Sequence, residues 1–223
     1  RHTFLMPVKK QDPILVVIEF LEKYPALYKT QKRKDIPDPR TKAGKLKIKK
    51  IMEDALLKKI IPSTPETIPD PLVSIILEAF HGIKKNKLTN IAKEHQLSMS
   101  AENVVGALLE HYINSESKHY GWCICAGSVV NGTDFLRKTN GGNEWELLQI
   151  KNRDNSENSS SSSIRDVVKQ NSGIVIKKWF RTKSRTGKTN WDNFPDEDLK
   201  DILNESSFED HVRKYLKSLK SKA

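Results

Sequence analysis

Three residues in the second half of this 223-residue chain have side chains suited to phosphodiester hydrolysis: Asp134, Gln149 and Lys151. Gln149 and Lys151 are two positions apart in an apolar, strand-like segment, so their side chains point to the same face of the predicted strand. Asp134 lies in a shorter predicted strand just before it. If the two strands pair antiparallel, opposite residues lie about 4.5–5.5 Å apart. A carboxylate, an amide oxygen and an ammonium group then converge, although the spacing alone is also typical of a surface ion pair.

This set of groups predicts a magnesium site. Mg²⁺ accepts a carboxylate, carbonyl oxygens, waters and phosphate oxygens as ligands, and Asp134, Gln149 and the backbone carbonyl of Ile150 supply the protein's share. The ion would activate a water and neutralise charge on the attacked phosphate. Lys151 would orient or deprotonate that water and stabilise the developing negative charge.

The strands that position these residues are predicted from Tyr120 onward. Residues 120–130 are rich in strand formers, and Asn131-Gly132 is a strong hairpin turn signal. Residues 133–136 form a second short strand, 139–143 a turn and 145–151 a third strand. Cys123 and Cys125 would share a face of the first strand, where a disulfide is disfavoured, and two ligands are too few for structural zinc. We expect two small buried residues in a reducing environment.

The first hundred residues are predicted to be helical. Asp12-Pro13, Asp38-Pro39 and Asp70-Pro71 each combine an N-cap residue with proline at the first helical position, and apolar residues follow at helical spacing. Prolines at 62, 65 and 69 indicate a linker. Residues 87–97 and 104–113 predict two helices joined by a turn at Ser98-Met99-Ser100, either a DNA-reading helix-turn-helix or ordinary helix packing. Helix returns after Trp191, where Ser206 and Glu209 match a capping box.

The positive net charge of the chain indicates which class of partner it binds. The formal net charge is +11 and the pI is about 9.5, which favours a polyanionic partner, nucleic acid before an anionic membrane, over a merely basic soluble protein. The sequence has no apolar stretch of about 18 residues, so we expect no membrane-spanning segment. Residues 1–6 lack the features of a signal peptide, and we expect a chain that has lost a start residue or a leader.

Three segments resemble the SinI-type restriction endonucleases of the PD-(D/E)XK nuclease superfamily. They are Gly132-Thr133-Asp134-Phe135, the run from Leu148-Gln149-Ile150-Lys151-Asn152-Arg153 to Ser162, and Ile176-Lys177-Lys178-Trp179-Phe180-Arg181. The resemblance implies an α/β (α+β) fold built on an α-β-β-β-α-β core, with a mixed central sheet flanked by helices. We expect a helical N-terminal region over 1–100, for dimerisation or for embracing DNA, and the nuclease core with C-terminal helices over 101–223.

The resemblance also implies roles for the site residues. Asp134 corresponds to the metal-binding aspartate and Lys151 to the lysine, whereas Gln149 stands where the general pattern has Asp or Glu. An amide brings no charge, so the missing carboxylate would come from elsewhere. Glu110 and Glu157 are the candidates, although either is also explained as a solvated charge or a structural partner. Glu146, three residues before Gln149, should face the other side of its strand.

The polar run after Lys151 offers amides, hydroxyls and a guanidinium, the groups that contact phosphates and base edges. A mobile serine linker is the alternative reading. A basic loop at Lys183, Arg185 and Lys188 would either close over DNA or be an ordinary solvated loop. The candidate DNA-binding residues are Asn152, Arg153, Asn155, Ser156, Asn158, Ser159, Ser160, Arg165, Lys177, Lys178 and Arg181.

The function that follows is Mg²⁺-dependent cleavage of double-stranded DNA by a type II restriction endonuclease, at a palindromic site that the resemblance implies is GGWCC-like. A palindrome implies a homodimer, and the resemblance implies a cognate DNA methyltransferase and the cytoplasm of a prokaryotic cell. Two alternatives remain. One is a non-catalytic, sequence-specific DNA-binding protein on a degenerate nuclease scaffold, which Gln149 keeps open. The other is a structure-selective nuclease of repair or RNA processing.

Overall fold

The computed structural model describes residues 12–28, 37–63, 70–139, 142, 144–154 and 174–221. They divide into two compact units, one made of Arg1–Lys58 with Leu109–Ala223 and the other of Lys59–Leu108. The first two helices therefore group with the sheet. Among the described residues, no helix is both long enough and apolar enough to cross a membrane.

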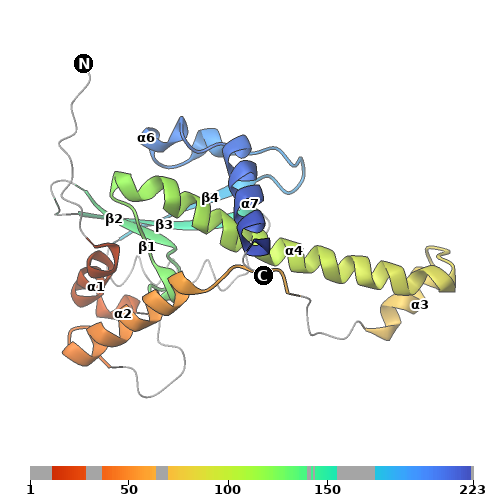
Figure 1. Cartoon of the computed structure of the whole chain (residues 1–223), viewed down its shortest axis with the longest axis horizontal. Coiled ribbons are helices and arrows are strands. Elements are labelled where there is room, and N and C mark those ends of the chain that lie inside the picture. The colour runs from red at the N-terminus through yellow and green to blue at the C-terminus, as the bar shows by residue number, and fades with distance from the viewer. Residues whose placement is uncertain are drawn as a thin grey trace. The chain divides into compact units, whose positions relative to one another are not determined.

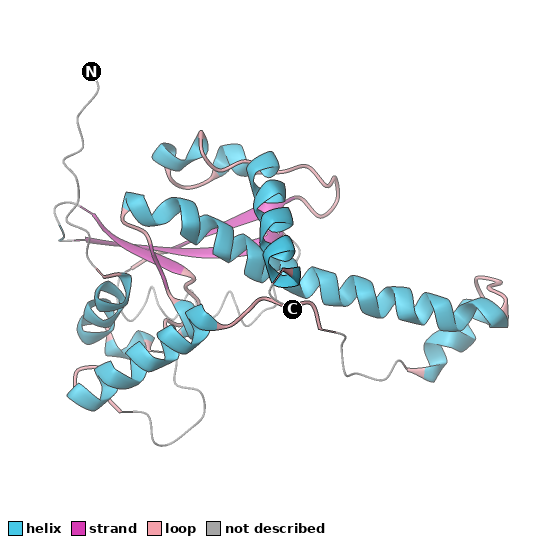
Figure 2. Ribbon diagram, in the orientation of Figure 1, coloured by secondary structure: helices cyan, strands magenta, loops and turns pink. Residues whose placement is uncertain are grey.

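A four-stranded mixed sheet lies at the centre of the larger unit (Figures 1 and 2). The order is β1 (Cys123–Ile124), β2 (Phe135–Thr139), β3 (Glu144–Arg153) and β4 (Ile176–Thr182). The first three strands pair antiparallel, and β4 joins β3 in parallel. This confirms the mixed sheet flanked by helices. The strand expected over 120–130 is shorter, because Ala126–Ser128 forms a 3-10 turn in which Gly127 has a φ of 72°.

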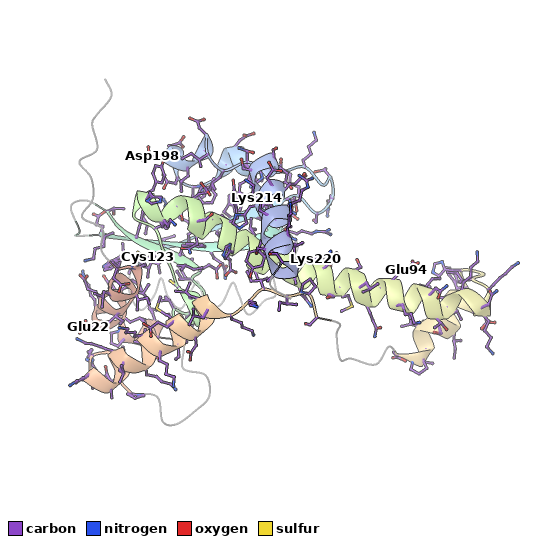
Figure 3. The ribbon with its side chains drawn as sticks, viewed as in Figure 1. Glu22, Glu94, Cys123, Asp198, Lys214 and Lys220 are labelled. Atoms are coloured by element: carbon purple, nitrogen blue, oxygen red, sulfur yellow. The ribbon has the colours of Figure 1, made fainter. Side chains whose placement is uncertain are left out.

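Helices α1 (Pro13–Lys23) and α2 (Lys42–Leu57) cover one face of this sheet. Their buried apolar side chains share one core with Leu136, Leu147 and Ile176 on the strands. Cys123 and Cys125 are buried in the same core as free thiols, as expected, and Cys123 is labelled in Figure 3. The predicted start of the second helix at Asp38-Pro39 is wrong. Asp38 accepts hydrogen bonds from Arg40, and Thr41 caps the helix instead.

The opposite face of the sheet carries an aromatic cluster. Trp179 of β4 contacts Trp191 and Phe194, and Tyr112 of α4 (Lys85–Ser117) packs against Trp191 and Phe208. Trp191 begins η5 (Trp191–Asn193), Phe194 directly follows it, and Phe208 belongs to α7 (Glu205–Lys220), with the short α6 (Glu197–Lys200) in between. The capping box at Ser206 and Glu209 is wrong, because α7 begins earlier and its cap is the side chain of Asn204, which accepts from Ser207 N–H.

The smaller unit contains α3 (Pro71–Ala79) and the first part of α4 (Lys85–Ser117). The predicted turn at Ser98-Met99-Ser100 is wrong, because α4 runs through it without a break. The helix-turn-helix reading fails with it. Serine lowers helix propensity only slightly, and neither Gly nor Pro occurs from Lys85 to Val105 to stop the helix.

Strands β2 and β3 are also joined by charge. Arg137 lies directly opposite Glu146 in the ladder, and its Nε donates to that carboxylate at 2.6 Å. The same guanidinium donates to Asp196, which also accepts from the indole N–H of Trp122. The Asp196 side chain is only 4% exposed, so the pair is well shielded from water. Glu146 faces away from Gln149, as predicted.

A pair of imidazoles links α4 to α7. His111 Nδ1 and His211 Nε2 are 2.8 Å apart, within hydrogen-bond distance. Burial lowers the pKa of His111. Burial also lowers the pKa of His211, and the neighbouring His111 lowers it further. Both imidazoles are therefore held neutral in the folded chain at pH values where the unfolded chain, with a His pKa of about 6.5, begins to bind protons.

This pair predicts a loss of stability in mild acid. The pKa values of both histidines are lower in the folded chain than in the unfolded chain. The stabilisation from this pair is therefore fully present above about pH 6.5 and is lost as the pH falls toward the pKa values of the folded chain. We expect the contribution of this pair to the free energy of unfolding, measured by urea titration as the difference between the native chain and a chain without the pair, to decrease between about pH 7 and pH 5. Replacing both residues (His111→Gln with His211→Gln) should flatten that decrease. His119→Gln, at an exposed position just after α4, is the control and should leave it unchanged; an equal slope in all three chains would contradict the assignment.

Candidate active site

Asp134 lies one residue before β2, and hydrogen bonds of its backbone and of its side chain hold it in place. Its backbone N–H donates to Leu148 O at 2.9 Å, and its carbonyl accepts from Cys125 N–H at 2.8 Å. Its Oδ2 accepts from the backbone N–H of Ile150 at 2.6 Å. A side-chain oxygen thus extends the β2–β3 ladder beyond its last backbone pair. The Asp134 carboxylate is thereby fixed against the backbone of β3.

The strand register brings the other predicted residues to this point. Phe135 pairs with Leu148, so continuing the antiparallel register by one residue puts Asp134 opposite Gln149. Gln149 is 6% exposed, and Lys151 follows it on the same face of β3. In an extended strand the N–H and C=O of one residue point to the same neighbouring strand. The Ile150 carbonyl is therefore expected to point to the side on which its N–H binds Asp134.

Glu110 approaches the same point from α4. Burial and, to a smaller extent, the negative charge of Asp134 raise the pKa of Glu110 to about 7, although the positive charge of Lys151 opposes both effects. These effects require the three groups to lie within electrostatic reach of one another. Its helix is held in place by Leu109, Tyr112 and Ile113, each no more than 2% exposed. Of the two carboxylates considered as replacements for the missing charge, Glu110 is brought to Asp134, whereas Glu157 lies outside the described residues.

Cys125 is a neighbour that the sequence did not assign to the site. Burial raises the pKa of its thiol well above the usual range, and the charges of Asp134, Cys123 and Glu110 add to that effect. A thiol with a raised pKa stays protonated and is a poor metal ligand, because only the thiolate binds metals well. Cys125 therefore forms an apolar wall beside the carboxylates. Its place in a buried C-x-C segment gave no indication of this proximity.

The oxygen groups at this point suit a hard divalent cation. Within the described ranges, no group of three or more His, Cys, Asp or Glu side chains is arranged to hold a metal ion. Mg²⁺ does not need such a cage, since it is usually held by one or two carboxylates together with waters and substrate phosphates. Glu110 and Asp134 supply two carboxylates, and Gln149 and the Ile150 carbonyl supply neutral oxygens. The donor set fits Mg²⁺ better than a thiol- or imidazole-binding metal.

The basic residues of β4 divide between the two faces of the sheet. Lys178 pairs with Gln149 in the parallel ladder, and so shares the site face. Lys177 points to the other face, where its Nζ donates to Glu146 at 2.7 Å. Arg181 is on that other face too, where it donates to Asn152 and Glu205 and lies over the Phe208 ring. The alternation of side chains along a strand predicts that Lys177 and Lys178 lie on opposite faces of the sheet. Which of them shares the face of Gln149 follows only from the strand register.

Of the remaining residues predicted to contact DNA, only Asn152 and Arg153 lie within the described part of the chain. Asn152 is tied to β4, its Oδ1 accepting from Arg181 and its carbonyl from Thr182. Arg153 is exposed on the last residue of β3 and, by alternation, on the same face as Gln149 and Lys151. The other predicted contacts lie outside the described residues: Asn155, Ser156, Asn158, Ser159, Ser160 and Arg165.

Comparison with known proteins agrees with this arrangement. A model of the SinI restriction endonuclease family matches residues 9–218. The type II restriction enzyme SinI of Salmonella infantis is 42% identical over 207 residues, which are 92% of this chain and 86% of that protein. The type II restriction enzyme Eco47I of Escherichia coli is 50% identical over 155 residues, which are 70% of this chain and 65% of that protein. The resemblance drawn from three short segments is confirmed along most of the chain, which belongs to the SinI restriction endonuclease family.

Proposed function

We propose that Asp134, Glu110, Gln149, Lys151 and the Ile150 carbonyl form the cleavage centre of this restriction endonuclease. The observation that carries the proposal is that the Glu110 carboxylate lies within electrostatic reach of both Asp134, which is fixed to Ile150 of β3, and Lys151. Two carboxylates held together repel each other, and a bound cation relieves that repulsion. The family already favours a DNA-cleaving enzyme over the alternatives of a binding protein and a repair nuclease.

Each residue then has a separate task in phosphodiester hydrolysis. When bound, Mg²⁺ supplies a water of lowered pKa and neutralises charge on the phosphate. Asp134 and Glu110 give the site two negative charges, and Gln149 with the Ile150 carbonyl gives neutral oxygens. Lys151, on the Gln149 face, is in place to orient the water and to stabilise negative charge on the phosphate. Glu110 thereby supplies the charge that Gln149 lacks.

The substrate proposed is double-stranded DNA with a short palindrome of the GGWCC type, which the resemblance to SinI-type enzymes implies. Each chain has one candidate centre and a duplex has two strands. A two-fold homodimer therefore accounts for a double-strand cut. A cognate methyltransferase in the same system belongs to this proposal, since a host with such an enzyme needs its own sites protected.

Contacts to DNA are proposed on the site face of the sheet. Lys178, beside Gln149, and Arg153, beyond Lys151, share that face. The turn after β4 adds Lys183, Arg185 and Lys188, all exposed. This turn is closed by the backbone bonds from Lys183 N–H to Lys188 O and from Gly187 N–H to Lys183 O, and Gly187 takes a positive φ of 67°. Lys and Arg on an exposed turn next to the site are suited to hold phosphates.

The role of Glu110 is tested by Glu110→Gln. We expect the rate of DNA cleavage with Mg²⁺ to fall by about a hundredfold or more, because a charged metal-supporting oxygen is lost. Glu116→Gln is the matched control, on the same helix but six residues later, where its carboxylate accepts from Ser115. It should cleave at close to the native rate. Cleavage at the native rate by Glu110→Gln would remove Glu110 from the centre, and Glu157 would become the remaining candidate.

The two lysines at the start of β4 predict different salt dependence. Lys178→Ala should weaken DNA binding and reduce the slope of log K against log salt concentration by about 0.9, the value for one phosphate contact. Lys177→Ala changes the neighbouring residue on the opposite face, where it pairs with Glu146, and should leave the slope unchanged. Equal slopes for Lys178→Ala and the native chain, measured by fluorescence anisotropy with a short duplex, would show that the DNA does not lie on the Lys178 face.

A further inference from the structure

Helix α3, in the smaller unit, has an apolar stripe on its outside. Leu72, Val73, Ile76 and Phe80 fall within an arc of about 100° at 3.6 residues per turn. Their exposed fractions are 62%, 51%, 57% and 83%, and none of the residues of α3 is buried. On α1, by contrast, the apolar residues Val17, Phe20 and Leu21 are fully buried.

The partly covered side of α3 is a different one. Gly82, with a φ of 67°, and the bond from Ile83 N–H to Leu77 O turn the chain between α3 and α4. The partly covered positions of α3 are Ser74 and Leu77, about 40–100° further round the helix than the nearest edge of the stripe. The apolar stripe therefore points away from the partly covered side of its helix.

Apolar exposure continues beyond the stripe on α3 itself. Ile75, about 60° round the helix from Leu72, is 58% exposed. Partly exposed apolar side chains of this size present on the order of 100 Å² each. Five of them on each of two copies present on the order of a thousand square ångström, comparable to the lower end of a specific protein interface.

The charge of this face argues against DNA as its partner. Residues 71–79 contain one acidic residue, Glu78, and no Lys or Arg, in a chain whose net charge is +11. A DNA-facing surface is rich in Lys and Arg. A neutral apolar stripe can instead face an identical stripe across a two-fold axis without repulsion between like charges. Two helical hairpins packed in this way form a four-helix bundle, which buries what one hairpin cannot.

We propose that the outer stripe of α3 is the surface through which two copies of this chain dimerise. The choice of a second copy rests on the proposed function, because one cleavage centre per chain and two DNA strands require two chains. Leu72, Val73, Ile76 and Phe80 form the centre of the interface, and Ile75 extends it. Each residue on one copy meets the same stripe on the other, as a two-fold interface demands.

The test measures the molar mass of the full chain in solution by sedimentation equilibrium, without DNA. The native chain should have twice its 25.5 kDa mass, and Ile76→Glu should shift it to the monomer. The control is Leu57→Glu, which changes an 82% exposed leucine of α2 and should remain dimeric. Because Ile76 is exposed in the single chain, its substitution should leave the circular dichroism of the folded chain unchanged.

The possible outcomes distinguish a failure of the proposed interface from a failure of the proposed function. A native chain that is monomeric both alone and on a DNA duplex overturns the proposal, and so does a dimer that survives Ile76→Glu. A monomeric Ile76→Glu chain that nicks plasmid DNA but no longer linearises it supports both the interface and the two-chain cut. A native dimer that Ile76→Glu dissociates, but that cleaves no DNA with Mg²⁺, supports the interface and refutes the proposed function. Weaker DNA binding by an Ile76→Glu chain that stays dimeric would assign the stripe to DNA instead.

Discussion

The hydrogen bond from Ile150 N–H to the Asp134 carboxylate is the contact on which the candidate site depends. It takes the place of a backbone pair at the point where β2 has not yet begun, so it fixes an acidic side chain relative to the backbone of β3. Gln149, Lys151 and the Ile150 carbonyl are all positioned by that same stretch of β3. A change in register by one residue would send Gln149 and Lys151 to the opposite face of the sheet.

Two cores hold that register. On one face, α1 and α2 pack against Leu136, Leu147 and Ile176, and on the other the aromatic cluster around Trp179 ties β4 to the C-terminal helices. The second core also positions the part of α4 that carries Glu110, through Tyr112. The Arg137–Glu146 pair adds a cross-strand link on the face away from the site. Carboxylates that repel each other are thus held together by packing elsewhere, an arrangement characteristic of functional sites.

Local patterns in the sequence predicted the parts of this structure that depend on neighbouring residues. The strand with Gln149 and Lys151 follows from alternation, and the start of α1 follows from Asp12-Pro13, whose aspartate accepts from Ile14 N–H. The turn predicted at Ser98-Met99-Ser100 was wrong because serine interrupts a helix only weakly when no Gly or Pro is present. The cap predicted at Ser206 was wrong because Asn204 caps the same helix. Glu110 was only one of two candidates, since the proximity of a helix to a strand end 24 residues later is set by tertiary packing. The His111–His211 pair and the position of Lys178 beside Gln149 depend on long-range contacts in the same way.

The measurement that tests the central claim most directly is digestion of plasmid DNA by the native chain, by Asp134→Ala and by Lys151→Ala, with Mg²⁺ and with EDTA. A cleavage centre built on Asp134 and Lys151 predicts discrete fragments from the native chain with Mg²⁺ only. It also predicts no fragments from either variant, although both still bind the duplex. Discrete fragments from the Asp134→Ala chain, or binding without cleavage by the native chain under any divalent metal, would contradict it.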